Sequence, residues 1–185
     1  MALWIVLGVV ALLILWIIGM YNGMIKSKIK IDNAWSDISV FLKKRFDLIP
    51  NLVNTVKGYA AHESQTLEKV IQARNAAVAV PTGDVAGMAA ANQQLGGALR
   101  GLLAIAESYP DLKANAQFIE LQNALQGIEG ELANSRRYYN ATVRDFNTSI
   151  QQFPGVLVAK IGNFTPREFF ELEDKNEAKN VEVKF

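Results

Sequence analysis

The residue pair His62–Glu63 is the first feature that suggests chemistry, because histidine followed by glutamate opens the zinc-binding motif of many metalloproteases. That motif requires a second histidine at position 66, which holds Thr66 instead. The chain contains one histidine and no cysteine, so it offers neither an imidazole cluster nor a thiolate site. We therefore expect no metal site and assign His62 a structural role.

Other catalytic constellations are absent from the sequence as well. A serine or threonine nucleophile would need a base, and no GxSxG elbow occurs. The glycines lie inside an apolar helical pattern and do not form a phosphate loop. A formal net charge of +1 gives no reason to expect nucleic acid binding. We expect no catalytic residue, no cofactor and no enzymatic activity, and we interpret the carboxylates near the C-terminus as a solvated acidic face: Glu171, Glu173, Asp174 and Glu177.

Function must then follow from how the chain is organised, and the segment Ala2–Tyr21 dominates that organisation. It holds 20 residues without a charge, enough for an α-helix to cross a hydrocarbon layer about 30 Å thick. A signal peptide would show a basic start, a shorter apolar run and a cleavage site, and a lipoprotein would need a cysteine. We predict a transmembrane anchor over residues 1–25. Its membrane-spanning residues include Leu3, Trp4, Leu12, Leu15, Trp16 and Ile18.

Three lysines follow the span and predict its orientation. Lys26, Lys28 and Lys30 would lie at the membrane surface, where each contributes about 1 kcal/mol beside anionic headgroups. The positive-inside rule places this end in the cytoplasm. The alternative, a periplasmic body, stays open because three lysines are a modest bias.

Beyond the lysines, apolar residues recur at helical spacing. From Ile31 to Val80 we predict one long amphipathic helix with a kink near Pro50, and we leave open whether it continues the membrane helix. A second helix is predicted from Val85 to Glu107, after a turn in which Asp84 can act as the N-cap.

A third helix is predicted from Pro110 to Gln152, unless Gly127 and Gly130 divide it in two. The predicted fold class is therefore all-α. An N-terminal transmembrane helix precedes an elongated up-and-down helical bundle of three long helices, or four, over residues 26–155.

Residues 156–185 are predicted to form a short C-terminal helix and a mobile tail. Thr165 to Glu168 reads as a capping box, which predicts a helix over Pro166–Leu172. The charged stretch Glu173–Asn180 has no apolar pattern, whereas Val181–Phe185 alternates as a strand would. A frayed terminus and strand addition to a partner are the two interpretations of that last stretch.

Several polar residues lie on or beside the apolar stripes, where buried polar groups need partners. We predict that Glu63 pairs across the bundle with Arg136 or Arg137, and that Asn140 and Asn147 set the alignment of the helices. The alternative is that they are rim residues facing water.

The unequal helix lengths indicate association. Two helices of roughly 60 to 70 Å and one of roughly 35 Å cannot cover each other fully, so apolar surface should remain exposed. Anchored copies share orientation and high local concentration, which favours lateral homo-oligomers. The candidate contact residues are Gly96, Gly97 and Gly101.

Three segments carry a resemblance to a known family. They read AWSDISVFLKKRFDLIPNLVNTVKGYAAHE from Ala34, YPDLKA from Tyr109 and RRYYNATVRDFN from Arg136, and Phe153–Pro154 follows. In this order they closely resemble the LemA family of bacterial membrane proteins. The resemblance implies an N-terminal anchor, a bundle of about four helices and no enzymatic activity.

The expected function is a non-enzymatic, membrane-anchored scaffold that assembles with itself in the bacterial inner membrane. Its partners would be the lipid bilayer and further copies of the chain. The alternative is an adaptor that presents its bundle and tail to a membrane protease or signalling partner.

Overall fold

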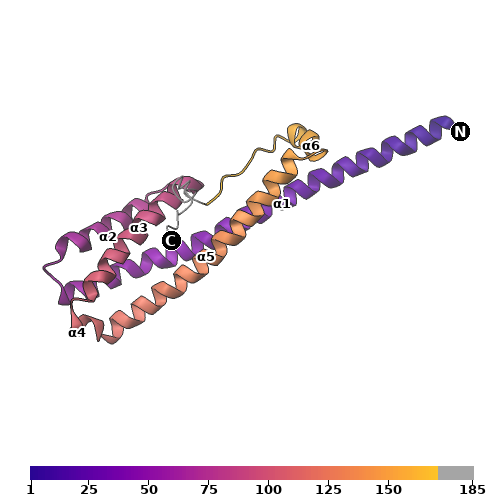
Figure 1. Ribbon diagram of the computed structural model, residues 1–185. Coiled ribbons are helices and arrows are strands. Elements are labelled where there is room, and N and C mark those ends of the chain that lie inside the picture. Colours follow the sequence, from indigo (N-terminus) through magenta and orange to yellow (C-terminus); the bar gives the residue numbers. More distant parts are fainter. Residues whose placement is uncertain (171–185) are drawn as a thin grey trace, which may run out of the picture. The chain divides into compact units, whose positions relative to one another are not determined.

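The computed structural model describes residues 1–170, and every regular element within them is an α-helix (Figure 1). This confirms the predicted all-α class. The chain forms two compact units, and helices α1 and α5 contribute to both. Of the described residues, unit 1 comprises 1–45 and 126–169, and unit 2 comprises 46–125 and 170. The elements are α1 (Ala2–Tyr59), α2 (Ser64–Val78), α3 (Val85–Ala106), α4 (Pro110–Lys113), α5 (Ala116–Gln151) and α6 (Gly155–Ile161).

Helix α1 answers the question that the sequence left open, because the membrane segment and the first bundle helix are one continuous helix. The helix passes Pro50 and ends at Tyr59. The prediction of a single helix from Ile31 to Val80 was therefore wrong, since α2 begins only at Ser64. Side chains from later in the chain bond at this corner: Asn115 Nδ2 donates to Tyr59 Oη (2.9 Å), and Tyr109 Oη lies 3.5 Å from Glu63 Oε1.

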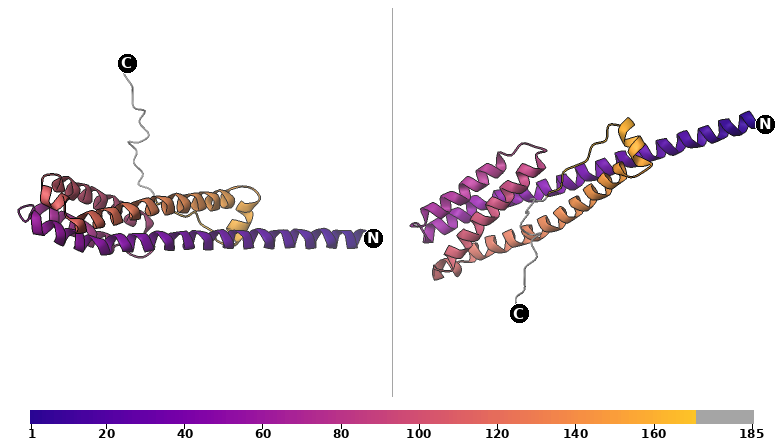
Figure 2. Two further views of the ribbon diagram at one scale, coloured as in Figure 1. Left: turned by 90° about the horizontal axis from the view of Figure 1, so that it is seen from below. Right: turned by 45° about the horizontal axis from the view of Figure 1, so that its top comes forward.

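In unit 2, α2 and α3 form a helical hairpin and lie side by side in Figures 1 and 2. The predicted helix after Asp84 is confirmed, because the Gly87 N–H donates to Asp84 Oδ1 at 2.7 Å. The core of this unit comprises Ile49, Leu52, Val56, Val70, Leu95, Leu102, Leu112 and Phe118.

The third predicted helix is interrupted near its start. Helix α4 ends at Lys113, and Asn115 caps α5 by accepting a hydrogen bond from the Phe118 N–H at 2.9 Å. A sequence signal existed, since asparagine is a favoured N-cap. The predicted alternative of a break at Gly127 and Gly130 was wrong, because α5 runs without interruption to Gln151.

In unit 1, α5 packs antiparallel to α1. The rings of Trp35 and Tyr139 lie 5.7 Å apart, and Arg45 forms an ion pair with Glu129 further along both helices. Buried apolar side chains from the two helices fill the space between them: Ile31, Ile38, Leu42, Leu132, Val143 and Phe146.

After α6 the chain continues without helical structure through residues 164–169 and returns alongside α5 (Figure 1). The prediction of a helix over Pro166–Leu172 was therefore wrong for its described part, and the short C-terminal helix is α6 instead. The reason lies in Asn147, whose side chain hydrogen-bonds both backbone groups of Arg167. The predictions for Glu173–Asn180 and Val181–Phe185 lie outside the described residues.

Candidate functional site

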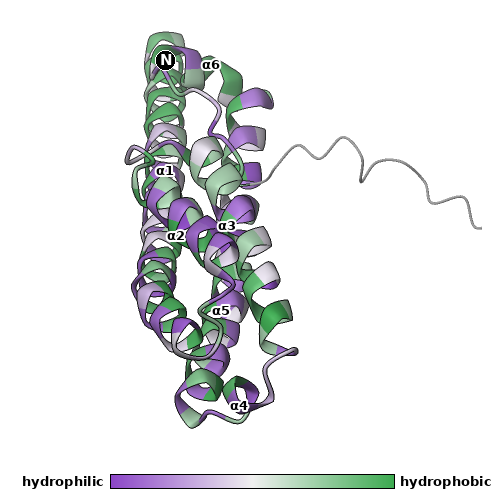
Figure 3. Ribbon diagram, turned by 90° about the vertical axis from the view of Figure 1, so that its left-hand side faces the viewer, coloured by the Kyte–Doolittle hydropathy of each residue, from purple (hydrophilic) through white to green (hydrophobic). Residues whose placement is uncertain are grey.

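The membrane segment is the first part of the candidate site. Its most apolar 18-residue window has a mean hydropathy of 2.8, and none of it is buried against the rest of the chain. The hydrophobic colouring of α1 near its N-terminus is visible in Figure 3. All six predicted membrane-spanning residues are exposed: Leu3, Trp4, Leu12, Leu15, Trp16 and Ile18. A helix that is apolar on all sides and unburied requires an apolar environment from outside the chain.

Burial begins at the end of this segment, where Met24 is the first buried residue of α1. Helix α6 packs here. A Cβ atom placed on Gly155 would lie 3.2 Å from Met24 Cε, and one on Gly162 would lie 3.0 Å from Tyr21 Cε2. The Tyr21 and Phe164 rings are 5.5 Å apart. Helix α6 therefore lies against α1 at the level of residues 21–24.

The three lysines predicted to contact headgroups lie just beyond this level, and all three are exposed. The Lys30 ammonium lies 5.5 Å from the centre of the Tyr138 ring, in a cation–π arrangement. Lys30 lies about 14 Å from Tyr21 along the axis of α1. Lys26 and Lys28 are closer to the apolar segment, and their contact with headgroups stays a prediction.

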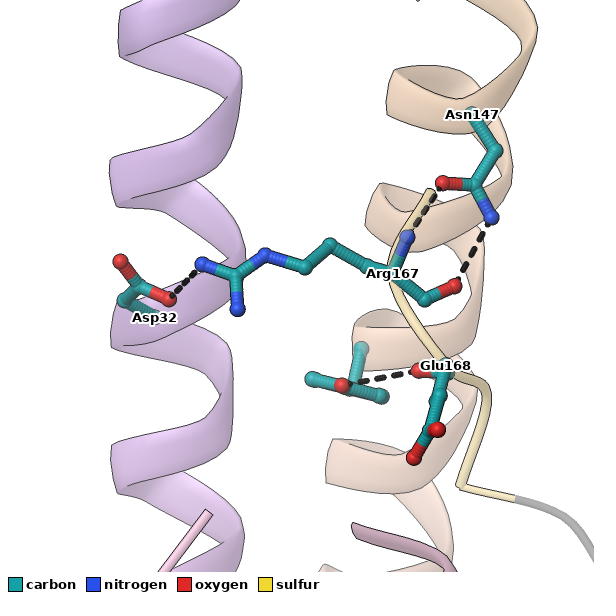
Figure 4. A network of polar contacts seen from close by, with 5 residues as sticks. Asp32, Asn147, Arg167 and Glu168 are labelled. Atoms are coloured by element: carbon teal, nitrogen blue, oxygen red, sulfur yellow. Dashed lines mark hydrogen bonds and ion pairs between the residues drawn. The ribbon is translucent and has the colours of Figure 1, made fainter. Parts of the chain in front are cut away.

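A polar network fastens the segment after α6 to both helices of unit 1 (Figure 4). The Arg167 N–H donates to Asn147 Oδ1 (2.8 Å), and Asn147 Nδ2 donates to the Arg167 carbonyl (2.9 Å). The Arg167 guanidinium bonds Asp32 on α1 at 3.0 Å, and Tyr139 Oη donates to the Glu168 carbonyl at 3.0 Å. The segment is thereby tied to α1 and to α5.

Tyr139 is the buried ionisable residue of this network. Burial raises the pKa of the Tyr139 hydroxyl above its usual value, and the charges of Glu168 and Asp32 act in the same direction. Arg167 opposes them. At neutral pH the hydroxyl therefore stays protonated and available as a donor.

The predicted polar pairs have different outcomes. Asn147 does bond across unit 1, but to backbone groups of a non-helical segment. Asn140 is buried on the same helix. Glu63 belongs to unit 2 and both Arg136 and Arg137 belong to unit 1, so their pairing stays a prediction.

The predicted glycine contact residues lie on α3 with Gly96 half-buried and both Gly97 and Gly101 exposed. The Cβ positions at Gly97 and Gly101 have no neighbour closer than 3.9 Å. Their role in association stays a prediction. His62 is exposed in the turn between α1 and α2, and residues 1–170 contain no group of three potential metal ligands among His, Cys, Asp and Glu.

Arg45 is buried and forms an ion pair with half-exposed Glu129 on α5. Sequence reasoning missed one feature of unit 1. Helix α6 was missed because its apolar run is too short for its periodicity to be decided.

A model of the LemA family matches residues 34–185. The chain is 27% identical to Protein LemA of Metamycoplasma hominis over 74% of this chain and 62% of that protein. It is 26% identical to Magnetosome protein MamQ 2 of Paramagnetospirillum magneticum, over 82% of this chain and 64% of that protein. Magnetosome protein MamQ of Magnetospirillum gryphiswaldense is also 26% identical, over 81% of this chain and 64% of that protein. The chain thus spans less than two thirds of the length of these relatives.

Proposed function

Because this chain belongs to the LemA family, we propose that it acts as a non-enzymatic, membrane-anchored helical scaffold that assembles laterally with itself. The observation that carries the anchorage is the 18-residue apolar window of α1, none of which is buried by the chain. The continuity of α1 supports it further, because the helix passes without interruption from this window into the core of unit 1.

The outward face of α1 supports self-association. Ile29 and Val40 lie 11 residues apart, or about three helical turns, so they share a face. Both side chains are about half exposed, whereas Ile38 on the opposite face is fully buried. A second anchored copy could cover the Ile29–Val40 face, and anchoring in one membrane would raise its effective concentration.

The proposed location is the bacterial inner membrane with the body in the cytoplasm. Lys26 and Lys28 are exposed directly after the apolar segment, where the positive-inside rule applies. A body in the periplasm is the alternative that a topology measurement would reveal.

The proposal is tested by the mass of the detergent-solubilised full-length protein, measured by light scattering after size exclusion. The wild type should form discrete oligomers, and the double variant Ile29→Glu, Val40→Glu should dissociate into smaller species. Ala141→Glu is the control, because it adds a charge at an exposed position on α5. A monomeric wild type would overturn the scaffold and favour an adaptor that binds a different membrane protein.

A further inference from the structure

We propose that α6 and the turn before it form a second membrane contact, which lies flat in the headgroup region beside the point where α1 leaves the bilayer. The proposal rests on the proposed anchorage of α1. It adds a specific lipid-facing surface, defined by Phe153, Leu157 and Ile161, which we call the α6 apolar face.

The α6 apolar face is exposed to an unusual degree. Phe153 is 81% exposed, Leu157 54% and Ile161 78%. Among the described residues that follow the apolar segment of α1, no other large apolar side chain exceeds 52%. Leu157 and Ile161 are four residues apart and share one side of α6. Val158 and Ala159, which point in other directions around the helix, are buried.

The depth of the α6 apolar face follows from its packing against α1. Gly155, the first residue of α6, and Gly162, which directly follows α6, approach α1 at Met24 and Tyr21. The apolar segment of α1 ends at Tyr21, and tyrosine is a typical residue of the membrane interface. If α1 spans the bilayer, α6 must therefore lie at the boundary between hydrocarbon and headgroups.

The positively charged residues near α6 are consistent with a position at the membrane interface. Lys160 is exposed on α6 between Leu157 and Ile161, and Lys26 is exposed on α1 just beyond Met24. Amphipathic helices at a membrane interface combine apolar side chains with lysines that reach the headgroups. The surface is continuous with the span, which favours lipid over a protein partner as its occupant.

The chain contains no cysteine, so single cysteines can carry a spin label in the full-length protein. The test positions are Leu157→Cys and Ile161→Cys. Leu12→Cys reports the span, and Glu131→Cys, exposed on α5, reports water. Each variant is reconstituted into phosphatidylethanolamine and phosphatidylglycerol vesicles. For each variant, the collision rate of the spin label with oxygen, which concentrates in lipid, is compared with its collision rate with a water-soluble nickel complex.

We expect the labels at Leu157 and Ile161 to collide several-fold less often with the nickel complex than the label at Glu131 does. We also expect both labels to lie at a shallower depth in the membrane than the label at Leu12. If both are as water-accessible as Glu131 while Leu12 is in lipid, the α6 contact is wrong and the anchorage stands. If Leu12 is water-accessible, the anchorage itself fails. Spin coupling at Leu157 that disappears on dilution with unlabelled protein would mean that another copy covers this face, which also overturns the proposal.

Discussion

At the scale of the residue, Asn147 determines the path of the chain after α6. Its side-chain amide donates to the Arg167 carbonyl and accepts from the Arg167 N–H, so Asn147 satisfies both backbone groups of Arg167. The Thr165–Glu168 sequence carries the local signal for a helix, but this pairing stabilises a non-helical segment instead. The side-chain amide of Asn147 therefore outweighs the local helix signal of the capping box at Thr165–Glu168.

Replacing Asn147 by aspartate tests this role. The variant Asn147→Asp keeps an acceptor for the Arg167 N–H but loses the donor to its carbonyl, so we expect a loss of about 1–3 kcal/mol in unfolding free energy. Denaturant unfolding in detergent, followed by circular dichroism, measures the change. Asn134→Asp, at an exposed position on α5, should leave the midpoint nearly unchanged. Equal effects of the two variants would contradict the assigned role.

Tyr139 gives a prediction for alkaline pH. Burial raises the pKa of Tyr139, so an absorbance titration should show a late phase above the usual tyrosine range that belongs to this residue. Tyr139→Phe should remove that late phase. A titration with the same phases in both proteins would count against the burial effect.

The same shift affects stability. Below the usual tyrosine pKa of about 10, both the folded and the unfolded state keep the proton, so Tyr139 adds no pH dependence. As the pH rises further, the unfolded chain loses the proton first, so the free energy of unfolding falls. The fall should be smaller in Tyr139→Phe, as judged by urea denaturation at several alkaline pH values.

At the scale of the element, two glycines make a matched test of α6 packing. A Cβ atom on Gly155 would lie 2.1 Å from the Ser149 carbonyl oxygen, whereas one on Gly130 would meet nothing within 4 Å. We expect Gly155→Ala to weaken the docking of α6 by about 1–3 kcal/mol. Gly130→Ala should stabilise α5 by about 0.5–1 kcal/mol, because glycine is unfavourable inside a helix.

Hydrogen exchange resolved by mass spectrometry measures both changes. Exchange over residues 155–161 should accelerate in Gly155→Ala and stay unchanged in Gly130→Ala. Unchanged exchange in Gly155→Ala would show that α6 accepts a side chain at this position.

At the scale of the whole molecule, topology can be measured with the cysteine-free chain. Ala141 is exposed on α5, so Ala141→Cys should react with a membrane-impermeant maleimide only after the cells are lysed, if the body is cytoplasmic. Labelling of intact spheroplasts would instead place the body in the periplasm. Labelling under denaturing conditions is the control for the total amount of reactive cysteine.

Features that depend on local composition could be predicted from the amino-acid sequence. The apolar run Ala2–Tyr21 needs no partner to be recognised, and the helix after Asp84 follows from its cap and its periodicity. The family also followed from the sequence, because its motifs are contiguous residues. For the candidate site, the predicted span residues and lysines are exposed, as a surface that meets lipid requires.

The ends of the helices and the partners of the polar residues depend instead on contacts between distant parts of the chain. The break after Tyr59 has no proline or turn cluster, and it coincides with hydrogen bonds from Tyr109 and Asn115, which lie far along the chain. The non-helical path through Arg167 depends on Asn147 and Asp32, which α5 and α1 supply. Each outcome depends on contacts between residues distant in sequence, because a buried polar group bonds whatever partner the fold brings within reach.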